Sequence, residues 1–368
     1  MEFIELYKGI DSLYVSFKGT LKEDIKAQLE EKKSLAQSSD EKERALAKMI
    51  IEDHCFKVKD KGKGLYAYVL VDGWYHIQVS PSQRKTLPPV YVQLSSYLIT
   101  HVGIHEAMSY LRTVIESLVV KVDAETVSRA DLFVDFITDM DFEAIKKTSW
   151  IRRAKKYKNH WTGDIFTGWS MGFGGVISGR LYDKTEEIKE SGKYYLKSIW
   201  EMKGWSEGQR VWRLELQLER QFLKQMSVNG LSDFIDSSND IWRYCTDDWL
   251  RLVIEGDTEN RNRWETHPLW NMLQQVKFQS GDYTGITRTI SKSRMPDDRR
   301  LFLNGLGYIT AYAAIKGFDD IDEFTMIGFL LDMRKFLESY VKHLDRYEDS
   351  ADYLKTMINL KKIKYNKV

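Results

Sequence analysis

Residues 210–219 alternate polar and large apolar side chains more regularly than any other segment of the chain. A period of two places successive side chains on opposite faces of a β-strand. The two faces would hold Trp212, Leu214, Leu216 and Leu218 on one side and Arg213, Glu215, Gln217 and Glu219 on the other. Strands of this kind are typical of antiparallel sheets that are covered on one face only. The first part of the chain is therefore expected to contain such a sheet.

The strand signal is confined to the region before residue 230. The predicted strands there are residues 13–17, 65–71, 74–80, 90–95, 130–137 and a glycine-rich hairpin over 161–184, and the predicted helices are a hairpin within 20–58, 104–120 and 141–148. Later residues have helical patterns, over 232–254, 268–278 and 300–362. The chain is therefore predicted to be α+β, with an antiparallel-sheet domain over residues 1–230 and an all-α C-terminal domain over residues 231–368 that binds DNA or a partner.

Composition excludes few classes of function. Hydrophobic residues make up 43% of the 368 residues. Apolar runs such as Phe329–Leu331 are nevertheless far shorter than the roughly 20 residues of a membrane span. The N-terminus lacks the pattern of a signal peptide, so we expect a cytoplasmic protein without a membrane segment. The net charge of +1 does not by itself indicate nucleic-acid binding, but a neutral total is compatible with a local basic stripe.

Two other predicted strands carry polar side chains on one face. The period-two rule groups Asp131, Phe133 and Asp135 on one of them, and Arg180, Tyr182 and Lys184 on the other. If these strands are neighbours of residues 210–219 and the polar faces coincide, carboxylates, cations and a tyrosine gather at one place. The alternative is that the carboxylates belong to the solvated face of an antiparallel sheet and that the tyrosine is ordinary packing.

Such a gathering would have a chemical use. A tyrosine oxygen can attack a phosphodiester and hold the broken strand as a phosphotyrosine. The phenol needs activation because its ordinary pKa is about 10. A divalent metal held by carboxylate oxygens can polarise the phosphate. A neighbouring lysine or arginine can stabilise the developing negative charge.

The motifs also have a characteristic order along the chain. They are Arg129-x-Asp131-x-x-x-Asp135, then a glycine-rich run that leads into Tyr182-x-Lys184 with Glu187, and finally Arg213-x-Glu215. In this order and spacing they resemble the replication initiation factor family, the Rep_trans group found on rolling-circle plasmids, in phages and in some integrative conjugative elements. The resemblance covers roughly residues 10–225. It implies a Rep-like nicking fold.

The resemblance also implies an activity. Tyr182 is the expected nucleophile, assisted by Lys184 and Arg180. The expected function is initiation of rolling-circle DNA replication, in which one strand is nicked and rejoined at an origin through a 5′-phosphotyrosine. Expected partners are single-stranded or hairpin origin DNA and a host helicase, and a homodimer is one open assembly state. The alternatives are a relaxase of a conjugative or integrative element and a catalytically inactive, sequence-specific DNA-binding protein of mobile-element origin.

The expected metal site consists of carboxylates. Asp131, Glu215 and Asp135 are the candidate ligands, with the alternative that Asp135 is a structural partner of Arg129 or Arg213. The chain has no His-x-His motif, which other rolling-circle initiators use. An all-carboxylate set favours Mg²⁺ or Mn²⁺ over zinc.

A basic run lies between the Asp131 strand and the glycine-rich hairpin. The residues expected to contact DNA are Arg152, Arg153, Lys155, Lys156 and Lys158 of this run, together with Trp169 and Arg213. The cations would neutralise phosphates, and the indole would stack on unpaired bases. The alternative is a solvated loop. A second candidate patch for duplex DNA consists of Arg288, Lys292, Arg294, Arg299 and Arg300.

Overall fold

The computed structural model describes residues 2–82, 87–279, 298–318, 320, 322–344 and 347–364. Its largest element is an 11-stranded sheet in the order β2-β3-β4-β5-β6-β1-β7-β12-β11-β10-β9. The strands are β1 (Phe3–Leu21), β2 (Lys48–Ile51), β3 (His54–Val58), β4 (Tyr68–Val71), β5 (Tyr75–Val79), β6 (Val90–Leu94), β7 (Val119–Thr138), β9 (Tyr157–Thr162), β10 (Ile165–Met171), β11 (Ile177–Asp183) and β12 (Trp212–Glu219). All their pairings are antiparallel. The predicted α+β class with an antiparallel sheet is confirmed.

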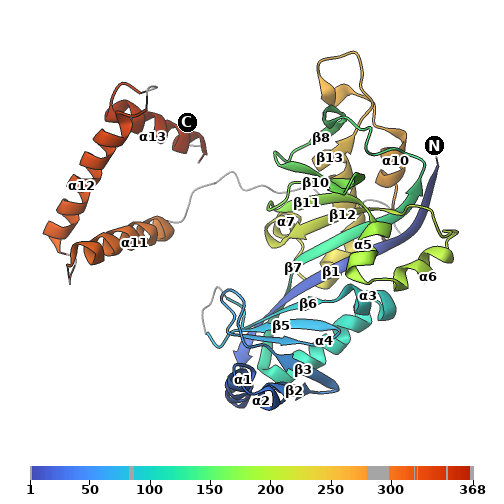
Figure 1. The fold of residues 1–368 in the computed structure, drawn as a ribbon, viewed down its shortest axis with the longest axis horizontal. Helices are drawn as coiled ribbons and strands as arrows, with labels where there is room; N and C mark the ends of the chain where they lie inside the picture. Colours follow the sequence, from blue (N-terminus) through green and yellow to red (C-terminus); the bar gives the residue numbers. More distant parts are fainter. Residues whose placement is uncertain are drawn as a thin grey trace. The chain divides into compact units, whose positions relative to one another are not determined.

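Two long strands form the centre of this sheet (Figure 1). β1 pairs with β6 on one side and with β7 on the other. The β1–β7 ladder runs from Phe3 opposite Thr138 to Leu21 opposite Val119 and contains several register shifts. Such irregularities bend a strand and increase its twist. One bent pair of strands therefore connects the β2–β6 half of the sheet with the β9–β12 half.

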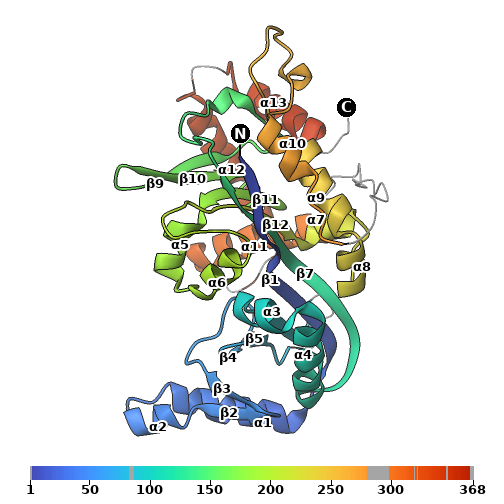
Figure 2. The same ribbon diagram turned by 90° about the vertical axis from the view of Figure 1, so that its right-hand side faces the viewer.

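Helices cover both sides of the β9–β12 half. Figure 2 shows α5 and α6 on one side of β1 and β7, and α7 to α10 on the other. The helices of this region and of the N-terminal half are α1 (Glu23–Ala36), α2 (Glu41–Ala45), α3 (Ser96–Val102), α4 (Ile104–Leu118), α5 (Lys184–Ser191), α6 (Tyr195–Glu201), α7 (Arg220–Gln225), α8 (Leu231–Asp236), α9 (Ser238–Arg243) and α10 (Pro268–Gln274).

The apolar face of β11 and β12 packs against tryptophan-bearing helices. Leu216 of β12, Trp242 of α9 and Trp270 of α10 are fully buried in one hydrophobic cluster. Gly179 of β11 shows how closely this region packs, because a Cβ atom there would lie 3.0 Å from the ring of Trp249. The helices that follow β12 in the sequence are therefore part of the core of the sheet.

Because of this packing, the boundary between the two compact units lies later in the sequence than predicted. The compact units of the chain are Met1–Thr289 and Ile290–Val368, whereas the sequence pattern placed the boundary near residue 230. The physical reason is that the half-apolar sheet needs a cover, and residues after 230 supply it. They also contribute β13 (Leu250–Leu252), which pairs with β8 (Trp150–Arg152). The region predicted to be all-α thus contains a short strand.

The described part of the second unit is helical, as predicted. Its helices are α11 (Asp298–Lys316), α12 (Glu323–Val341) and α13 (Ser350–Lys364). Tyr312 of α11 donates a hydrogen bond of 2.9 Å to Asp332 of α12. In the described part of the chain, none of the helices is both long and apolar enough to span a membrane.

Two segments predicted as helices have other structures. Residues 48–58 form β2 and β3, in which exposed and buried side chains alternate. Pairing with the sheet outweighs their weak helical preference. Residues 141–148 form bends and part of a 3₁₀ turn over Lys147–Ser149. The side chain of Asp141 accepts a hydrogen bond from the backbone N–H of Glu143 at 3.0 Å, which is an alternative to helical bonding.

We predict that residues 1–279 fold cooperatively without the remainder and that residues 1–230 do not. The shorter fragment lacks α8 to α10, so it exposes the apolar face of β11 and β12, and a bare apolar patch promotes aggregation. Thermal unfolding followed by circular dichroism, combined with size-exclusion chromatography, measures both properties. Identical transitions for the two fragments would contradict the assignment of residues 231–279 to the core.

Candidate active site

The three polar strand faces lie side by side. β11 pairs with β12 so that Arg180 is opposite Glu215 and Tyr182 is opposite Arg213. β12 pairs on its other side with β7, where Arg213 is opposite Asp135. Residues directly opposite each other project from the same face of a sheet. We call the face that carries these five residues the site face. As predicted, the strands of Asp135, Tyr182 and Glu215 are neighbours in the sheet.

Glu215 contacts both Tyr182 and Arg180. The Tyr182 hydroxyl donates a hydrogen bond of 2.7 Å to Oε2 of Glu215, and Arg180 forms an ion pair with Oε1. Glu215 is buried, whereas 45% of the Arg180 side chain is exposed. Burial, reinforced by the charge of Glu215, raises the pKa of Tyr182 well above its ordinary value of 10.0. The tyrosine is therefore a neutral hydrogen-bond donor near pH 7.

Arg213 is a fully buried cation with two carboxylate partners. Its Nε and Nη2 atoms donate to Asp135 at 2.5 and 2.8 Å, and Nη1 donates to Asp11 at 2.6 Å. Asp135 is also buried and accepts a hydrogen bond of 3.0 Å from the indole of Trp200. Two predictions are corrected, because Arg213 cannot reach DNA in this conformation and Asp135 is its structural partner. A structural role beside Arg213 is one of the two alternatives that the sequence leaves open for Asp135.

Asp131 lies further along β7 on the site face. Nε and Nη2 of Arg129 donate to its two carboxylate oxygens at 2.9 and 2.6 Å. Burial, opposed by Arg129 and reinforced by the charge of Glu215, raises the pKa of Asp131 to about 6. This carboxyl group therefore changes its charge just below neutral pH.

Lys184 lies at the junction of β11 and α5. Asp183 caps the helix by accepting a hydrogen bond of 3.1 Å from the backbone N–H of Glu186, which defines where the strand ends. Only 1% of the Lys184 side chain is exposed, and its ammonium group pairs with Glu187. Burial, together with the positive charge of Arg213, lowers the pKa of Lys184 to about 8. Its ammonium group is therefore a stronger acid than that of an ordinary lysine.

A cavity of about 650 Å³ is lined by Arg180, Tyr182, Lys184 and Glu215. The structure thus brings the predicted nucleophile, both predicted cationic assistants and one predicted metal ligand to one open space. Other lining residues were not singled out by the sequence patterns and include Asp11, His160, Ser170 and Lys193.

Two of these additional residues have specific partners. Nε2 of His160 and Oγ of Ser170 are 2.8 Å apart on neighbouring strands. The charges of Arg213, Lys193 and Lys184 outweigh burial and lower the pKa of the Asp11 carboxyl well below its usual range. Asp11 lies where the β1–β7 register shifts, between Ile10 and Ser12. A bulge of this kind breaks the period-two pattern, so strand periodicity contains no signal for this residue.

The three predicted metal ligands do not fit one ion together. Asp131 and Asp135 are four residues apart on β7, which corresponds to about 13 Å along a strand. Among the described residues, no group of three or more His, Cys, Asp or Glu side chains could hold a metal ion. Asp131 and Glu215 are diagonal neighbours on paired strands, a spacing of about 7 Å between Cβ atoms. These two could share an ion if the guanidinium groups of Arg180 and Arg129 moved away from Glu215 and Asp131.

The basic residues predicted to contact DNA do not form one patch. Lys158 in β9 is opposite Ser170, in the same row as Arg180 and Glu215, and therefore belongs to the site face. Other members of the run line a second pocket, at the turn between β10 and β11: Arg153, Lys155 and Lys156. Of the second basic cluster, Arg288, Lys292 and Arg294 lie outside the described residues, as do the side chains of Arg299 and Arg300.

Trp169 and Arg152 contribute to packing. Trp169 is buried, donates a hydrogen bond of 3.3 Å to the carbonyl of Phe142, and lies beside the ring of Trp150. It cannot stack on a base in this conformation, so its predicted contact with DNA is corrected. Arg152 is half-buried, with its guanidinium group 4.8 Å from the centre of the Tyr157 ring.

Comparison with solved structures shows a structural similarity to replication proteins of one kind. A solved rolling circle replication initiator protein from Geobacillus stearothermophilus superposes with a TM-score of 0.43 and 13% sequence identity, over 78% of this chain and 100% of that chain. No family model matches the sequence, and no curated protein matches it either. The family resemblance therefore stays a prediction from the motifs.

We predict that Arg213→Ala lowers the free energy of unfolding by about 3–5 kcal/mol, because it leaves the buried charge of Asp135 unpaired. The matched control is Arg112→Ala, which removes a two-point ion pair with Glu125 whose arginine is 47% exposed. That loss should be at most about 1 kcal/mol. Urea denaturation measures both values. Equal losses would show that the buried ion pair contributes no more to stability than the exposed one.

The pH dependence of stability should report on Asp131. Its pKa is about 6 in the folded protein against an ordinary 3.8. Its contribution to the free energy of unfolding is therefore complete below pH 3.8 and is lost as the pH rises to about 6. We predict that Asp131→Asn removes this decline, which amounts to at most about 3 kcal/mol. Urea denaturation across this pH window tests it, and parallel curves for the two proteins would be contrary evidence.

Proposed function

We propose that this protein initiates rolling-circle DNA replication by nicking and rejoining one strand at an origin through a covalent 5′-phosphotyrosine. The observation that carries the proposal is the 2.7 Å hydrogen bond from Tyr182 to Glu215 in a cavity that Arg180 and Lys184 also line. The arrangement offers a nucleophile, a proton acceptor and two cations to one phosphate. The order of the sequence motifs supports the same activity.

In the proposed step, the oxygen of Tyr182 attacks the scissile phosphorus while its proton passes to Glu215. A bond forms between that oxygen and phosphorus, and the bond between phosphorus and the 3′ oxygen breaks. The departing oxygen takes a proton from the ammonium group of Lys184, whose lowered pKa of about 8 favours this transfer. Attack of a 3′ hydroxyl on the phosphotyrosine reverses the step and rejoins the strand.

Arg180 has the geometry for charge stabilisation. Its guanidinium group pairs with Glu215, and 45% of its side chain is exposed. A phosphate in the cavity would compete for this guanidinium group, which would free Glu215 to accept the proton of Tyr182. The assistance matters because burial and Glu215 keep the phenol neutral at physiological pH. A fixed cation at a phosphate also stabilises charge that develops in the transition state.

We include a divalent cation, Mg²⁺ or Mn²⁺, in the proposal. Glu215 and Asp131 would hold it, since carboxylate oxygens suit these ions. When bound, such an ion polarises the phosphate as a Lewis acid. The positive charge would also keep Asp131 ionised, because a cation lowers the pKa of a neighbouring carboxyl group.

The proposed substrate is single-stranded or hairpin DNA at an origin. Lys158, on the site face, supplies positive charge beside the cavity. Because a nick does not itself open a duplex, we include a host helicase as a partner. The proposed setting is the cytoplasm, with residues 290–368 as the region for further DNA or partner contacts and a homodimer as one possible assembly state.

A covalent adduct separates this function from DNA binding without catalysis. Full-length protein is incubated with 3′-labelled, single-stranded origin-type DNA and Mn²⁺, then run on a denaturing gel. A 5′-phosphotyrosine retains the 3′ portion of the strand, so the label should migrate with the protein. Binding without an adduct would favour a catalytically inactive DNA-binding protein. A relaxase of a conjugative or integrative element would also give the adduct and would differ in its DNA substrate.

We predict that Tyr182→Phe abolishes the adduct and leaves folding and DNA binding nearly unchanged, since it removes the attacking oxygen and little else. Nicking rate, thermal unfolding and fluorescence anisotropy with labelled DNA measure the three properties. Undiminished nicking would remove Tyr182 from the mechanism. Tyr194, which is 53% exposed, and Tyr195 would then be the next candidates.

We predict that Glu215→Gln and Asp131→Asn each abolish cleavage and weaken Mn²⁺ binding, because each keeps the shape of the side chain and removes its charge. Isothermal titration calorimetry with Mn²⁺ measures binding independently of cleavage. Glu125→Gln, which changes a carboxylate paired with exposed Arg112, is the control and should alter neither property. Robust nicking by the unmodified protein in excess chelator would contradict a metal-assisted step.

A further inference from the structure

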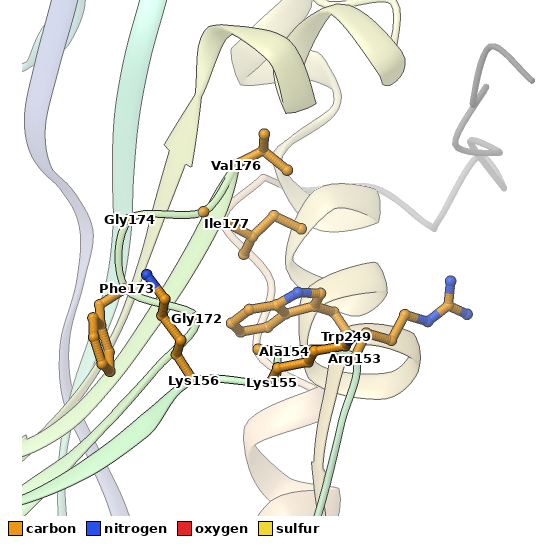
Figure 3. A pocket seen from close by; sticks show the side chains of 11 residues that line it. Arg153, Ala154, Lys155, Lys156, Gly172, Phe173, Gly174, Val176, Ile177 and Trp249 are labelled. Atoms are coloured by element: carbon orange, nitrogen blue, oxygen red, sulfur yellow. The ribbon is translucent and has the colours of Figure 1, made fainter. Parts of the chain in front are cut away.

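A second pocket, of about 320 Å³, lies at the turn that joins β10 to β11 (Figure 3). The turn itself, residues 172–176, forms much of its wall, and Trp249 also lines it. Arg153, Lys155 and Lys156 contribute side chains, and none of the described residues that line the pocket is acidic. The pocket is therefore suited to an anion.

The three cations are not equivalent. Arg153 points away from the pocket in Figure 3 and pairs with Asp248 at 3.1 Å. Lys155 and Lys156 are exposed, and the Lys156 ammonium group lies 5.6 Å from the centre of the Phe173 ring. The two lysines are thus the cations that can meet an incoming anion, and one of them lies beside an aromatic ring.

The turn presents that ring to solvent. Gly172 has a φ of +72°, and a Cβ atom there would lie 2.7 Å from both Ile177 and Trp249, so packing requires glycine. Gly174, with a φ of +73°, has no heavy atom within 4 Å of the Cβ position, so there is open space beside it. Phe173, between them, is 43% exposed. An exposed ring beside cations is typical of sites that bind unpaired nucleic acid.

The pocket lies at the turn end of the strands that carry the active site. Ile177, on the apolar face, lines the pocket, and Tyr182, on the site face, lines the catalytic cavity five residues further along β11. The carbonyl of Lys156 accepts a hydrogen bond of 2.8 Å from the backbone N–H of Gly172, which continues the β9–β10 pairing and puts Lys156 on the same face as Lys158. Five strand residues span about 17 Å. At about 3.4 Å per stacked nucleotide, this distance corresponds to roughly five nucleotides. Lys158 lies on the site face between the two ends of the hairpin, in the row of Arg180.

We propose that this pocket, the turn subsite, binds a backbone phosphate of the single DNA strand that Tyr182 cleaves, about five nucleotides from the scissile phosphate. Lys155 and Lys156 neutralise the phosphate, and Phe173 stacks on an adjacent unpaired base. The identity of the strand rests on the proposed function. The class of ligand is inferred from the positive charge and the aromatic ring of the pocket itself. Single-stranded DNA offers both a phosphate and an unpaired base. Free phosphate has no base, and the bases of duplex DNA are paired.

The first test measures the salt dependence of binding. Anisotropy with a labelled single-stranded oligonucleotide compares the full-length protein with the double variant Lys155→Ala/Lys156→Ala. Loss of one phosphate contact should lower the slope of log affinity against log salt by about 0.7. The control is Lys48→Ala/Lys57→Ala, which removes two exposed lysines that face each other on β2 and β3. An unchanged slope, or an equal change in the control, would overturn the proposal.

The second test concerns stacking. Phe173→Ala should weaken single-strand binding roughly 5- to 150-fold, and Phe173→Tyr, which keeps a ring, should restore it. A series of oligonucleotides carries one abasic site, at a different position in each. The affinity of the wild-type protein should fall when the abasic site is about five nucleotides from the nick. The affinity of Phe173→Ala should not change at that position. Identical abasic profiles would refute stacking. Competition by millimolar inorganic phosphate as strong as that by unlabelled oligonucleotide would identify a free-anion site instead.

The two proposals fail separately. An adduct on Tyr182 with an unchanged salt slope rejects the turn subsite and leaves nicking intact. The opposite result is also possible to recognise. If the salt slope depends on the two lysines and the abasic profile depends on Phe173, but no adduct forms, the turn subsite binds single-stranded DNA and nicking is rejected.

Discussion

The buried ion pair between Arg213 and Asp135 connects β12 to β7 in the middle of the sheet. Removing two charges from water costs several kcal/mol per ion, so such a pair is tolerated only with good geometry and further hydrogen bonds. Asp11 and an indole supply those bonds. A slip of β12 by one residue relative to β7 would turn Arg213 to the apolar face and leave Asp135 without its partner. The pair thereby favours a single register, and that register places Tyr182 and Glu215 within hydrogen-bonding distance.

The two faces of the sheet consequently have different roles. One face is apolar and packs with Trp242, Trp249 and Trp270, which makes the helices after β12 inseparable from the sheet. The other face holds the ionisable groups, and burial changes their proton affinities in useful directions. Lys184 becomes a stronger acid, and Asp131 becomes a weaker one.

Strand periodicity predicted a large part of this site. The alternation around Glu215 and the spacing of Asp131, Tyr182 and Lys184 indicated the correct shared faces, because a strand leaves a local, two-residue pattern. Contacts between distant segments leave no such pattern. The bulge that brings Asp11 to Arg213, the burial of Trp169 and the extension of the first unit beyond residue 230 all depend on which surfaces meet in space. The distance between Asp131 and Asp135 follows from their spacing on a strand. Which arginine each of them binds could be learned only from the folded chain.

The most direct test of the account is to locate the residue that becomes attached to DNA. Full-length protein is reacted with single-stranded origin-type DNA and Mn²⁺, the adduct is digested with nuclease and protease, and the nucleotide-bearing peptide is sequenced by mass spectrometry. We predict a nucleotide on Tyr182, in the peptide that continues into Lys184. A nucleotide on Tyr194, Tyr195 or any other residue would contradict it, because the hydrogen bond to Glu215 would then have no part in the reaction.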